Sequence, residues 1–207
     1  MQNKIFDICG TLYNSNTTMD FCEFRSTYLK KRLLKLSKSL FGKLINKILV
    51  KSISYDWIRI IHIRTLKGLD KISIEKDAEI FVEQFLNNRK IEEVHEYLNK
   101  FDKKEVILVS ATIEPVAKAI AKKLGDLNYF STTLNYSKNI CEGTIEDDLL
   151  GNKQHYFKNQ EIEFIITDNK SDLDLCKMAK EVVIVSKRKN LVFWQNQDLK
   201  LQKIIEV

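Results

Sequence analysis

The sequence predicts an α/β protein: a doubly wound, parallel, Rossmann-like sheet whose first strand is followed by an inserted all-helical cap. A short apolar run at residues 3–8 precedes a long region of helical periodicity, and from residue 105 onward compact β-branched runs alternate with amphipathic segments. Such alternation is typical of parallel sheets with helices on both faces. We therefore expect residues 1–14 and 102–207 to form the core, and residues 15–101 to form a cap over the carboxyl edge of the sheet.

Local patterns predict each element. Apolar residues at three- and four-residue spacings predict helices over most of residues 17–101, with Thr17 and Thr18 as an N-cap and breaks at Gly42 and Gly68. In the second half, β-branched runs predict strands and amphipathic segments predict helices. The predicted strands are residues 105–111, 128–136, 139–146, 162–169 and 181–186, with an edge strand at 190–194. The predicted helices are residues 113–125, 152–161 and 171–180.

The composition is typical of a globular protein with a sizeable core: 207 residues, 44% apolar, with one proline. No segment approaches the ~18 consecutive apolar residues of a membrane span. The first ten residues have no pattern of a secretory signal. The cysteines lack C-x-x-C and zinc spacings, so we expect free thiols in a reducing cytoplasm. These cysteines are Cys9, Cys22, Cys141 and Cys176.

The net charge of +6 is concentrated in residues 25–51, which carry nine Lys or Arg and no Asp or Glu. Its simplest interpretation is a solvated helix face with one buried apolar stripe. Two functional alternatives are a positive field that attracts an anionic phosphorylated substrate and a basic amphipathic surface that makes peripheral contact with an anionic membrane. We expect no nucleic-acid partner, because the usual RNA-binding motifs with interleaved aromatic residues are absent from the sequence.

Polar side chains stand at the carboxyl ends of three predicted strands: Asp7, Ser110 and Asp168. The carboxyl ends of parallel strands meet at one edge of the sheet, which is where open α/β sheets bind ligands. Two carboxylates at one point repel each other unless a cation lies between them. Mg²⁺ prefers oxygen ligands and often binds together with a phosphate. The sequence therefore predicts a magnesium and phosphate site at this edge.

Four short motifs strengthen this prediction because of their order. DICGTLY, VSAT, a lysine within LLGNKQHYF, and TDNKSD follow one another along the chain. Together they resemble the motifs of the haloacid dehalogenase (HAD) superfamily, and the arrangement is similar to the phosphoserine-phosphatase-like branch, with a helical cap after the first motif. The resemblance spans the motifs from residue 7 to residue 172 and implies a Mg²⁺-dependent hydrolase.

The resemblance implies a role for each residue of the first two motifs. Asp7 would be the nucleophile that forms an aspartyl-phosphate, and its second oxygen would bind Mg²⁺. Gly10 and Thr11 would form a turn whose backbone N–H groups cradle the phosphoryl oxygens. Ser110 and the amide of Ala111 would donate hydrogen bonds to the same phosphate. Taken alone, Asp7 could equally be a turn or helix cap, and Ser110 a hydroxyl that satisfies local backbone.

The last two motifs would complete the site. Lys153 would neutralise the developing negative charge, although Lys138 and Lys170 are alternatives for this partner. Asp168 would complete the metal site. Asp172, at the start of a helix, would support the metal through a neighbouring ligand or through water, or would only be a carboxylate favoured by the helix dipole.

Cys9 departs from the family pattern. Phosphatases of this family carry a second Asp at this position, which protonates the leaving alcohol and then activates water. The backbone carbonyl of Cys9 would still bind the metal, but a thiol with a pKa of about 8.5 is a poor replacement for the acid. Loss of a positioned general acid–base costs about 10²–10⁴-fold in rate. We therefore expect slow turnover of unactivated phosphomonoesters.

The sequence thus predicts a Mg²⁺-dependent phosphohydrolase or phosphotransferase that acts on a small or lipid-linked phosphomonoester. Two alternatives stay open: a catalytically decayed protein that binds a phosphate or a partner, and a dehalogenase-type hydrolase. Haloacid dehalogenases also lack an acid at the position of Cys9, but they need no metal, and the carboxylates of TDNKSD favour one here.

Overall fold

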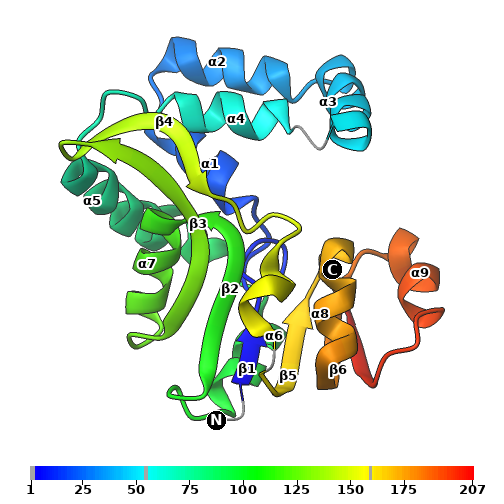
Figure 1. The fold of residues 1–207 in the computed structure, drawn as a ribbon. Coiled ribbons are helices and arrows are strands. Elements are labelled where there is room, and N and C mark those ends of the chain that lie inside the picture. Colours follow the sequence, from blue (N-terminus) through cyan, green and yellow to red (C-terminus); the bar gives the residue numbers. More distant parts are fainter. Residues whose placement is uncertain (1–2, 54–55, 159) are drawn as a thin grey trace.

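The computed structural model describes residues 3–53, 56–158 and 160–207, and in these residues the chain forms a seven-stranded sheet (Figure 1). The strand order is β4-β3-β2-β1-β5-β6-β7, and all neighbours are parallel except the β3–β4 hairpin. The strands are β1 Asn3–Phe6, β2 Val106–Ile113, β3 Asn128–Ser137, β4 Ile140–Asp147, β5 Ile162–Thr167, β6 Ala179–Ser186 and β7 Leu201–Glu206. The predicted doubly wound α/β fold is confirmed.

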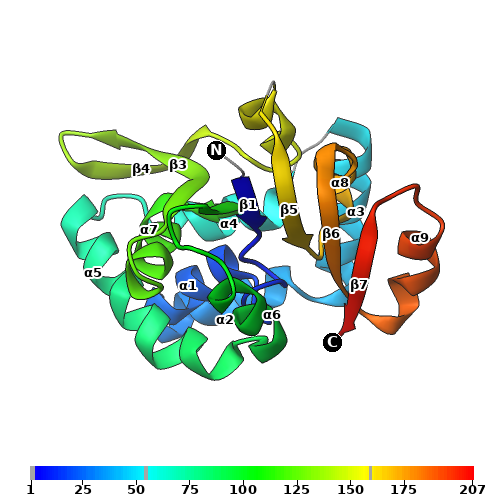
Figure 2. The same cartoon turned by 90° about the horizontal axis from the view of Figure 1, so that it is seen from below.

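Apolar side chains along each central strand alternate between two hydrophobic clusters, one on each face of the sheet. In β1, Ile5 belongs to one cluster and Phe6 to the other; in β2, Val109 and Leu108 are divided in the same way. Successive strand side chains point to opposite faces, so a sheet that is buried on both sides carries continuous apolar runs. Figure 2 shows the sheet from below, with α7 and α8 on opposite faces.

Residues 17–101 are mostly helical, as predicted. The elements are α1 Thr17–Arg25, α2 Tyr28–Ser37, α3 Leu40–Ile53, α4 Trp57–Arg64, α5 Lys71–Phe81, the π-helical turn η1 Val82–Leu86, the 3₁₀ turn η2 Asn87–Arg89 and α6 Glu92–Asn99. The N-cap of α1 is Asn16, whose side chain accepts a hydrogen bond from the Met19 amide, rather than the Thr pair that follows it. Both threonines are instead buried against the second strand.

These helices occupy two places. We call α2, α3 and α4 the upper helices, because they lie above the carboxyl edge of the sheet in Figure 1. Helices α5 and α6 lie lower, beside the sheet; α5 runs alongside α7 (Figure 2). The β3–β4 hairpin reaches the segment after α4, where the amides of Gly68 and Lys71 bond to the carbonyls of Cys141 and Asn139, each at 2.8 Å. The division of the chain into a core and a cap stays a prediction.

The C-terminal third differs from the sequence prediction at three elements. Residues 153–157 form a 3₁₀ turn where a helix over residues 152–161 was expected, and the strand at residues 201–206 was not predicted. Residues 190–194 were expected as an edge strand, but Leu191–Gln195 form a helix, α9, in which Trp194 is buried while Val192, two residues earlier, is exposed. The edge strand is β7, which pairs with β6. The remaining elements are α7 Glu114–Lys123, α8 Leu173–Met178 and the 3₁₀ turns η3 Lys153–Phe157, η4 Lys170–Asp172 and η5 Arg188–Asn190. Among the described residues, no helix has the length and apolar character of a membrane span.

Candidate active site

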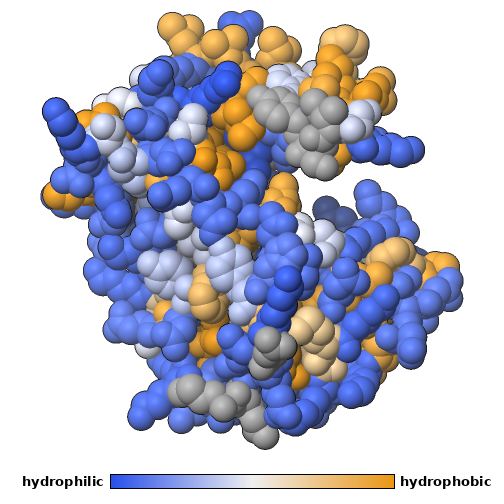
Figure 3. Space-filling model, in the orientation of Figure 1, coloured by the Kyte–Doolittle hydropathy of each residue, from blue (hydrophilic) through white to orange (hydrophobic). Residues whose placement is uncertain are grey.

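A cleft of about 670 Å³ opens at the carboxyl ends of β1, β2 and β5. Its floor carries Asp7, Ser110 and Asp168. Its upper wall carries Arg59 of α4 and Asp56, the residue before that helix. The end of β6 and the residues after it form a side wall, which consists of Val185, Ser186, Lys187, Lys189 and Asn190. Figure 3 shows the surface hollowed between α3 and the lower half of the molecule. The three strand-end side chains predicted to share one edge therefore do line one cleft.

Asp7 follows β1 directly and is 4% exposed. Its backbone amide continues the sheet by donating to the carbonyl of Ile166 at 3.0 Å. Its Oδ1 accepts a hydrogen bond from the Ile8 amide at 2.7 Å, and its Oδ2 lies 2.9 Å from the Lys153 ammonium. One oxygen is thus held by backbone and the other by a cation, which fixes the carboxylate at the cleft floor.

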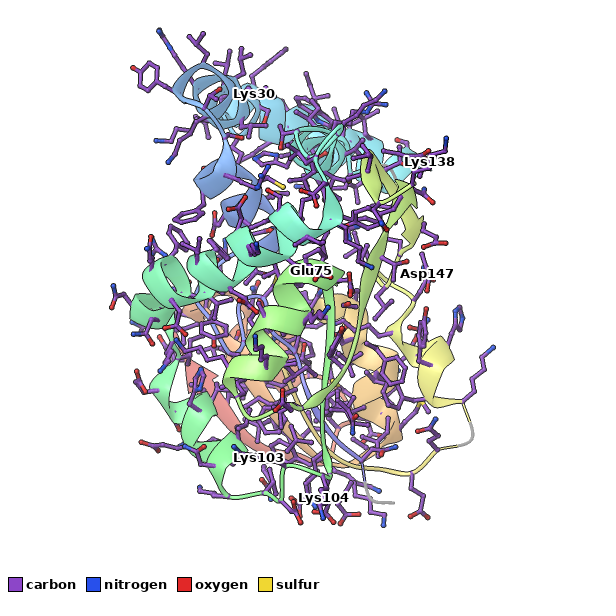
Figure 4. The ribbon with its side chains drawn as sticks, turned by 90° about the vertical axis from the view of Figure 1, so that its left-hand side faces the viewer. Lys30, Glu75, Lys103, Lys104, Lys138 and Asp147 are labelled. Carbon is purple, nitrogen blue, oxygen red and sulfur yellow. The ribbon has the colours of Figure 1, made fainter. Side chains whose placement is uncertain are left out.

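Lys153, from η3, is 3% exposed and lies between two carboxylates: its Nζ is 2.9 Å from Asp7 and 2.7 Å from Asp172. Burial alone would lower the pKa of Lys153, but the two negative charges and their hydrogen bonds outweigh it and hold the pKa above its ordinary value. The alternative lysines are elsewhere. Lys170 lies over the Phe193 ring, and Lys138 is in the turn of the β3–β4 hairpin, at the right-hand side of Figure 4.

Asp172 is 2% exposed, and its two oxygens differ in environment. Oδ2 accepts hydrogen bonds from Lys153 and from the Thr167 hydroxyl, each at 2.7 Å. Oδ1 is buried with no hydrogen-bond partner among the described residues. Burial raises the pKa of Asp172, and Asp7 adds to the rise, while Lys153 opposes it. Buried polar atoms usually have a partner, so the orphaned oxygen indicates a place for water or an ion.

Asp168 follows β5 and is fixed by the turn after β1. The Thr11 hydroxyl donates to its Oδ1 at 3.2 Å. Gly10 has a φ of +69°, and a Cβ atom at this position would overlap the Asp168 carboxylate, so both backbone conformation and space require glycine. Burial, followed by the charge of Asp7, raises the pKa of Asp168 to about 7. The two carboxylates therefore repel each other in the absence of a cation.

The second motif, Val109–Thr112, lines the cleft with two residues, Ser110 and Ala111. The Ser110 hydroxyl is fully buried and lies 3.0 Å from the Thr112 hydroxyl. Ala111 lines the cleft, and its carbonyl accepts a hydrogen bond from the Arg59 guanidinium at 2.9 Å. Both residues border the cleft beside Asp7, as predicted. Their role as phosphate ligands stays a prediction.

Cys9 also lines the cleft, and its thiol is held by hydroxyl groups. Its Sγ lies 2.8 Å from Thr17 Oγ1 and 3.1 Å from Thr112 Oγ1, and these two hydroxyls are 2.6 Å apart. Burial raises the pKa of the Cys9 thiol, and the neighbouring charge of Asp7 raises it further. Cys9 is therefore a neutral thiol at ordinary pH, and its partners among the described residues are hydroxyl groups.

Two features of the site were not predicted from the sequence. Arg59, 6% exposed, crosses from α4 to the core, where its Nη1 donates to both Asp148 oxygens at 2.6 and 2.9 Å and its Nη2 donates to the Thr132 hydroxyl at 3.0 Å. The run of three acids at residues 146–148 is typical of solvated charge, but Asp148 is paired with Arg59. The second feature is Thr17, whose hydroxyl contacts the Cys9 sulfur together with that of Thr112. No spacing in the sequence indicated this contact.

Comparison with known proteins shows a family match and several similar structures. Residues 5–177 match the family described as haloacid dehalogenase-like hydrolase. No curated protein matches the chain. A Bordetella pertussis Tohama I protein of unknown function has a similar structure, with a TM-score of 0.68, 13% identity and coverage of 99% of this chain and 97% of the other.

Two phosphatase structures are also similar. A phosphoserine phosphatase, solved as an analogue of its phospho-aspartyl intermediate, has a TM-score of 0.53 and 17% identity over 99% of this chain and 94% of the other. Cytosolic 5'-nucleotidase IIIB, solved with cytidine, has a TM-score of 0.64 and 12% identity over 99% and 80%. These likenesses show a shared fold, and the family match covers most of the chain. The protein therefore belongs to the haloacid dehalogenase-like hydrolase family.

Proposed function

We propose that this hydrolase is a Mg²⁺-dependent phosphohydrolase that acts through an aspartyl-phosphate on a small or lipid-linked phosphomonoester, and that Cys9 slows its turnover. The observation that carries the proposal is the Asp7 carboxylate at the cleft floor, held on one oxygen by Lys153 and facing Asp168. Carboxylate nucleophiles form covalent intermediates when their orientation and charge are fixed in this way.

The residues present fit a magnesium ion. Mg²⁺ is commonly held by one or two carboxylates, with water and substrate phosphate as the other ligands. Asp7 and Asp168 would supply the carboxylates and Cys9 its backbone carbonyl, while Asp172, with its orphaned oxygen, would support the ion. The described residues contain no preformed group of three His, Cys, Asp or Glu ligands. The proposed site would use two protein carboxylates and a backbone carbonyl, since the Cys9 thiol points to hydroxyls instead.

The remaining site residues act on the phosphoryl group. The ion, when bound, screens the phosphate oxygens and relieves the repulsion between the two carboxylates. A carboxylate oxygen of Asp7 attacks the phosphorus, and the new oxygen–phosphorus bond forms as the bond from phosphorus to the leaving alkoxide breaks. Lys153 stabilises the negative charge that develops at this position, and Ser110 donates its hydroxyl to an equatorial oxygen. The amides of Gly10, Thr11 and Ala111 supply further donors.

The weak step of the proposed cycle is proton transfer. An alkoxide leaving group requires a proton, and the aspartyl-phosphate requires a base to activate water. Cys9 lies where these transfers would be made, but its raised pKa keeps the thiol neutral, and a neutral thiol is a weak acid and not a base. Substrates with good leaving groups are therefore favoured in the first step.

The direct test is turnover of para-nitrophenyl phosphate with Mg²⁺ and with EDTA, for the wild type and for Asp7→Asn. The proposal requires activity that needs Mg²⁺ and disappears in Asp7→Asn, whereas Lys177→Met, at an exposed position that does not line the cleft, serves as an unaffected control. If the wild type is inactive and Cys9→Asp is active, the protein is a decayed phosphatase. Metal-independent chloride release from a 2-haloacid would instead establish dehalogenase chemistry.

A further inference from the structure

Helices α2 and α3 present apolar side chains to solvent at helical spacing. Helix α2 buries only Leu34, while its Leu residues at positions 29, 33 and 36 face outward. On α3 the outward residues repeat every four positions. We call this set the exposed stripe; it consists of Leu29, Leu33, Leu36, Leu40, Leu44 and Ile48, which are 57–90% exposed. Apolar patches of this extent on a soluble chain usually mark an interaction site.

The stripe is visible as the hydrophobic upper border of the molecule in Figure 3, over α2 and α3. A groove of about 500 Å³ lies within it, lined by Leu29, Leu33 and Leu36 with Arg32 at its side. Scattered exposed leucines need no explanation, but here the spacing of four residues on α3 aligns them along one helix face. Helices α2 and α3 are thus amphipathic, and their apolar side chains face solvent.

Positive charge accompanies the stripe. Within residues 25–51, Arg25 pairs with Asp77 and Lys38 with Glu23. Six exposed cations on α2 and α3 make no ion pair with any described residue, namely Lys30, Arg32, Lys35, Lys43, Lys47 and Lys51. Figure 4 shows Lys30 at the end of the molecule opposite Lys103 and Lys104. The surface therefore combines exposed apolar side chains with unneutralised positive charge.

This combination selects among possible occupants. A second copy of the chain would bury the leucines, but it would bring two sets of six cations together, and like charges across an interface oppose association. An anionic lipid surface meets both requirements, because leucines enter the boundary of the acyl region while lysines and arginines contact the headgroups. We infer that the exposed stripe and its flanking cations form a docking surface for an anionic membrane.

The docking surface is joined firmly to the rest of the protein. Leu34 anchors α2, and the Asn46 side chain on α3 accepts a hydrogen bond from the Ile58 amide of α4 at 3.2 Å. Helix α4 is in turn fastened to the core through Arg59. Docking would therefore hold the cleft at a constant position relative to the lipid surface. The inference rests on the surface alone and does not depend on the proposed phosphatase activity.

The test is co-sedimentation of the full chain with vesicles of phosphatidylcholine, alone or mixed with phosphatidylglycerol, at low and high salt. We expect binding only to the mixed vesicles, and weaker binding at high salt. Leu33→Asp should weaken it at least about tenfold, since a leucine that would enter the lipid layer is replaced by a negative charge that the anionic headgroups repel. Val192→Asp is the matched control, because Val192 on α9 has the same 67% exposure as Leu33.

A second pair of variants tests whether the positive charge of this surface contributes to vesicle binding. Lys30→Gln with Lys35→Gln should weaken binding about 25-fold, or about fivefold for each cation removed near an anionic surface. Lys103→Gln with Lys104→Gln removes the same charge from the opposite end of the molecule and should leave binding unchanged. All four positions are exposed, so these variants should keep the wild-type melting temperature.

Three results would overturn the inference. The first is a wild type that does not sediment with the mixed vesicles. The second is equal loss of binding in the test and control variants. The third is a wild-type dimer, seen by analytical ultracentrifugation, that Leu33→Asp separates into monomers, because a second copy would then cover the stripe. Should Leu33→Asp fail to fold, the lysine variants decide between binding that depends on this surface and binding that does not.

Discussion

Restoring a carboxylate at position 9 should accelerate turnover, and the expected gain depends on the leaving group. In Cys9→Asp the new side chain enters a site already lined by the hydroxyls of Thr17 and Thr112, which lie 2.8 and 3.1 Å from the present sulfur. Both hydroxyls can donate to a carboxylate. The two hydroxyls could therefore orient a general acid–base at position 9, a role that the wild-type cysteine does not fill.

The magnitude follows from the role of such a group. A positioned general acid–base contributes about 10²–10⁴-fold. We expect the lower part of this range, about 10²-fold in kcat for an alkyl phosphate, because carboxylate is longer than thiol and the two hydroxyls must move to admit it. Para-nitrophenolate leaves without a proton, so only the later hydrolysis of the intermediate should improve for this substrate, and the gain should be smaller.

The assay compares kcat for an alkyl phosphate and for para-nitrophenyl phosphate in Cys9→Asp, Cys9→Asn and the wild type. Cys9→Asn has the shape of the acid but cannot exchange a proton at neutral pH, so it separates proton transfer from packing. Equal rates for the Asp and Asn variants, with both folded by circular dichroism, would refute the argument. So would a gain that is the same for both substrates.

Three further results are expected. Lys153→Met should lower kcat by at least about 10²-fold and the free energy of unfolding by about 3–5 kcal/mol, because two buried carboxylates lose their cation; kinetics and urea denaturation measure these. Arg59→Met should cost about 1–2 kcal/mol in urea denaturation, a moderate loss because Asp148 is partly exposed. Burial lowers the pKa of His95, so the unfolded chain binds its proton more readily than the folded chain. The free energy of unfolding should therefore fall as the pH drops below about 6.5, by at most about 1.4 kcal/mol per unit, and His95→Gln should flatten the dependence.

Each of these changes has a control of the same residue type at an exposed position: Lys158→Met, Arg64→Met on the same helix, and His155→Gln. A control variant that behaves like its partner would show that residue type, and not the described contacts, sets the effect. For the pH experiment, an unchanged slope in His95→Gln would assign the dependence to another group.

The sequence allowed the central site residues to be placed because their position depends on backbone alone. Asp7 and Asp168 directly follow β1 and β5, and Ser110 lies where the register of β2 changes near its carboxyl end. Parallel strands bring these ends to one edge of the sheet whatever the helices do. Lys153 could be predicted only from the order of motifs, since its approach to Asp7 requires η3 to turn back over the sheet. The geometry places these side chains together; their catalytic roles stay predictions.

The remaining features depend on tertiary contacts that no local pattern encodes. Arg59 lies among basic and apolar residues of an ordinary helix, and its partner Asp148 is one acid in a run of three. Only the packing of α4 against the β3–β4 hairpin brings them together. Residues 190–194 were predicted as an edge strand because a short apolar run suits either structure. In a strand, Val192 and Trp194 would lie on the same face of the sheet. In the helix that forms, Trp194 is buried and Val192 is exposed.

The attachment of Arg59 also bears on how fast substrates are exchanged. One guanidinium joins α4 to a strand-end carbonyl at Ala111 and to a carboxylate at Asp148, so the wall above the cleft is tied to its floor. A cleft tied in this way is filled and emptied from its open side, without a hinge movement of the helices above it. We expect its turnover rate to be insensitive to solvent viscosity, because no large body has to be displaced through the solvent in each cycle.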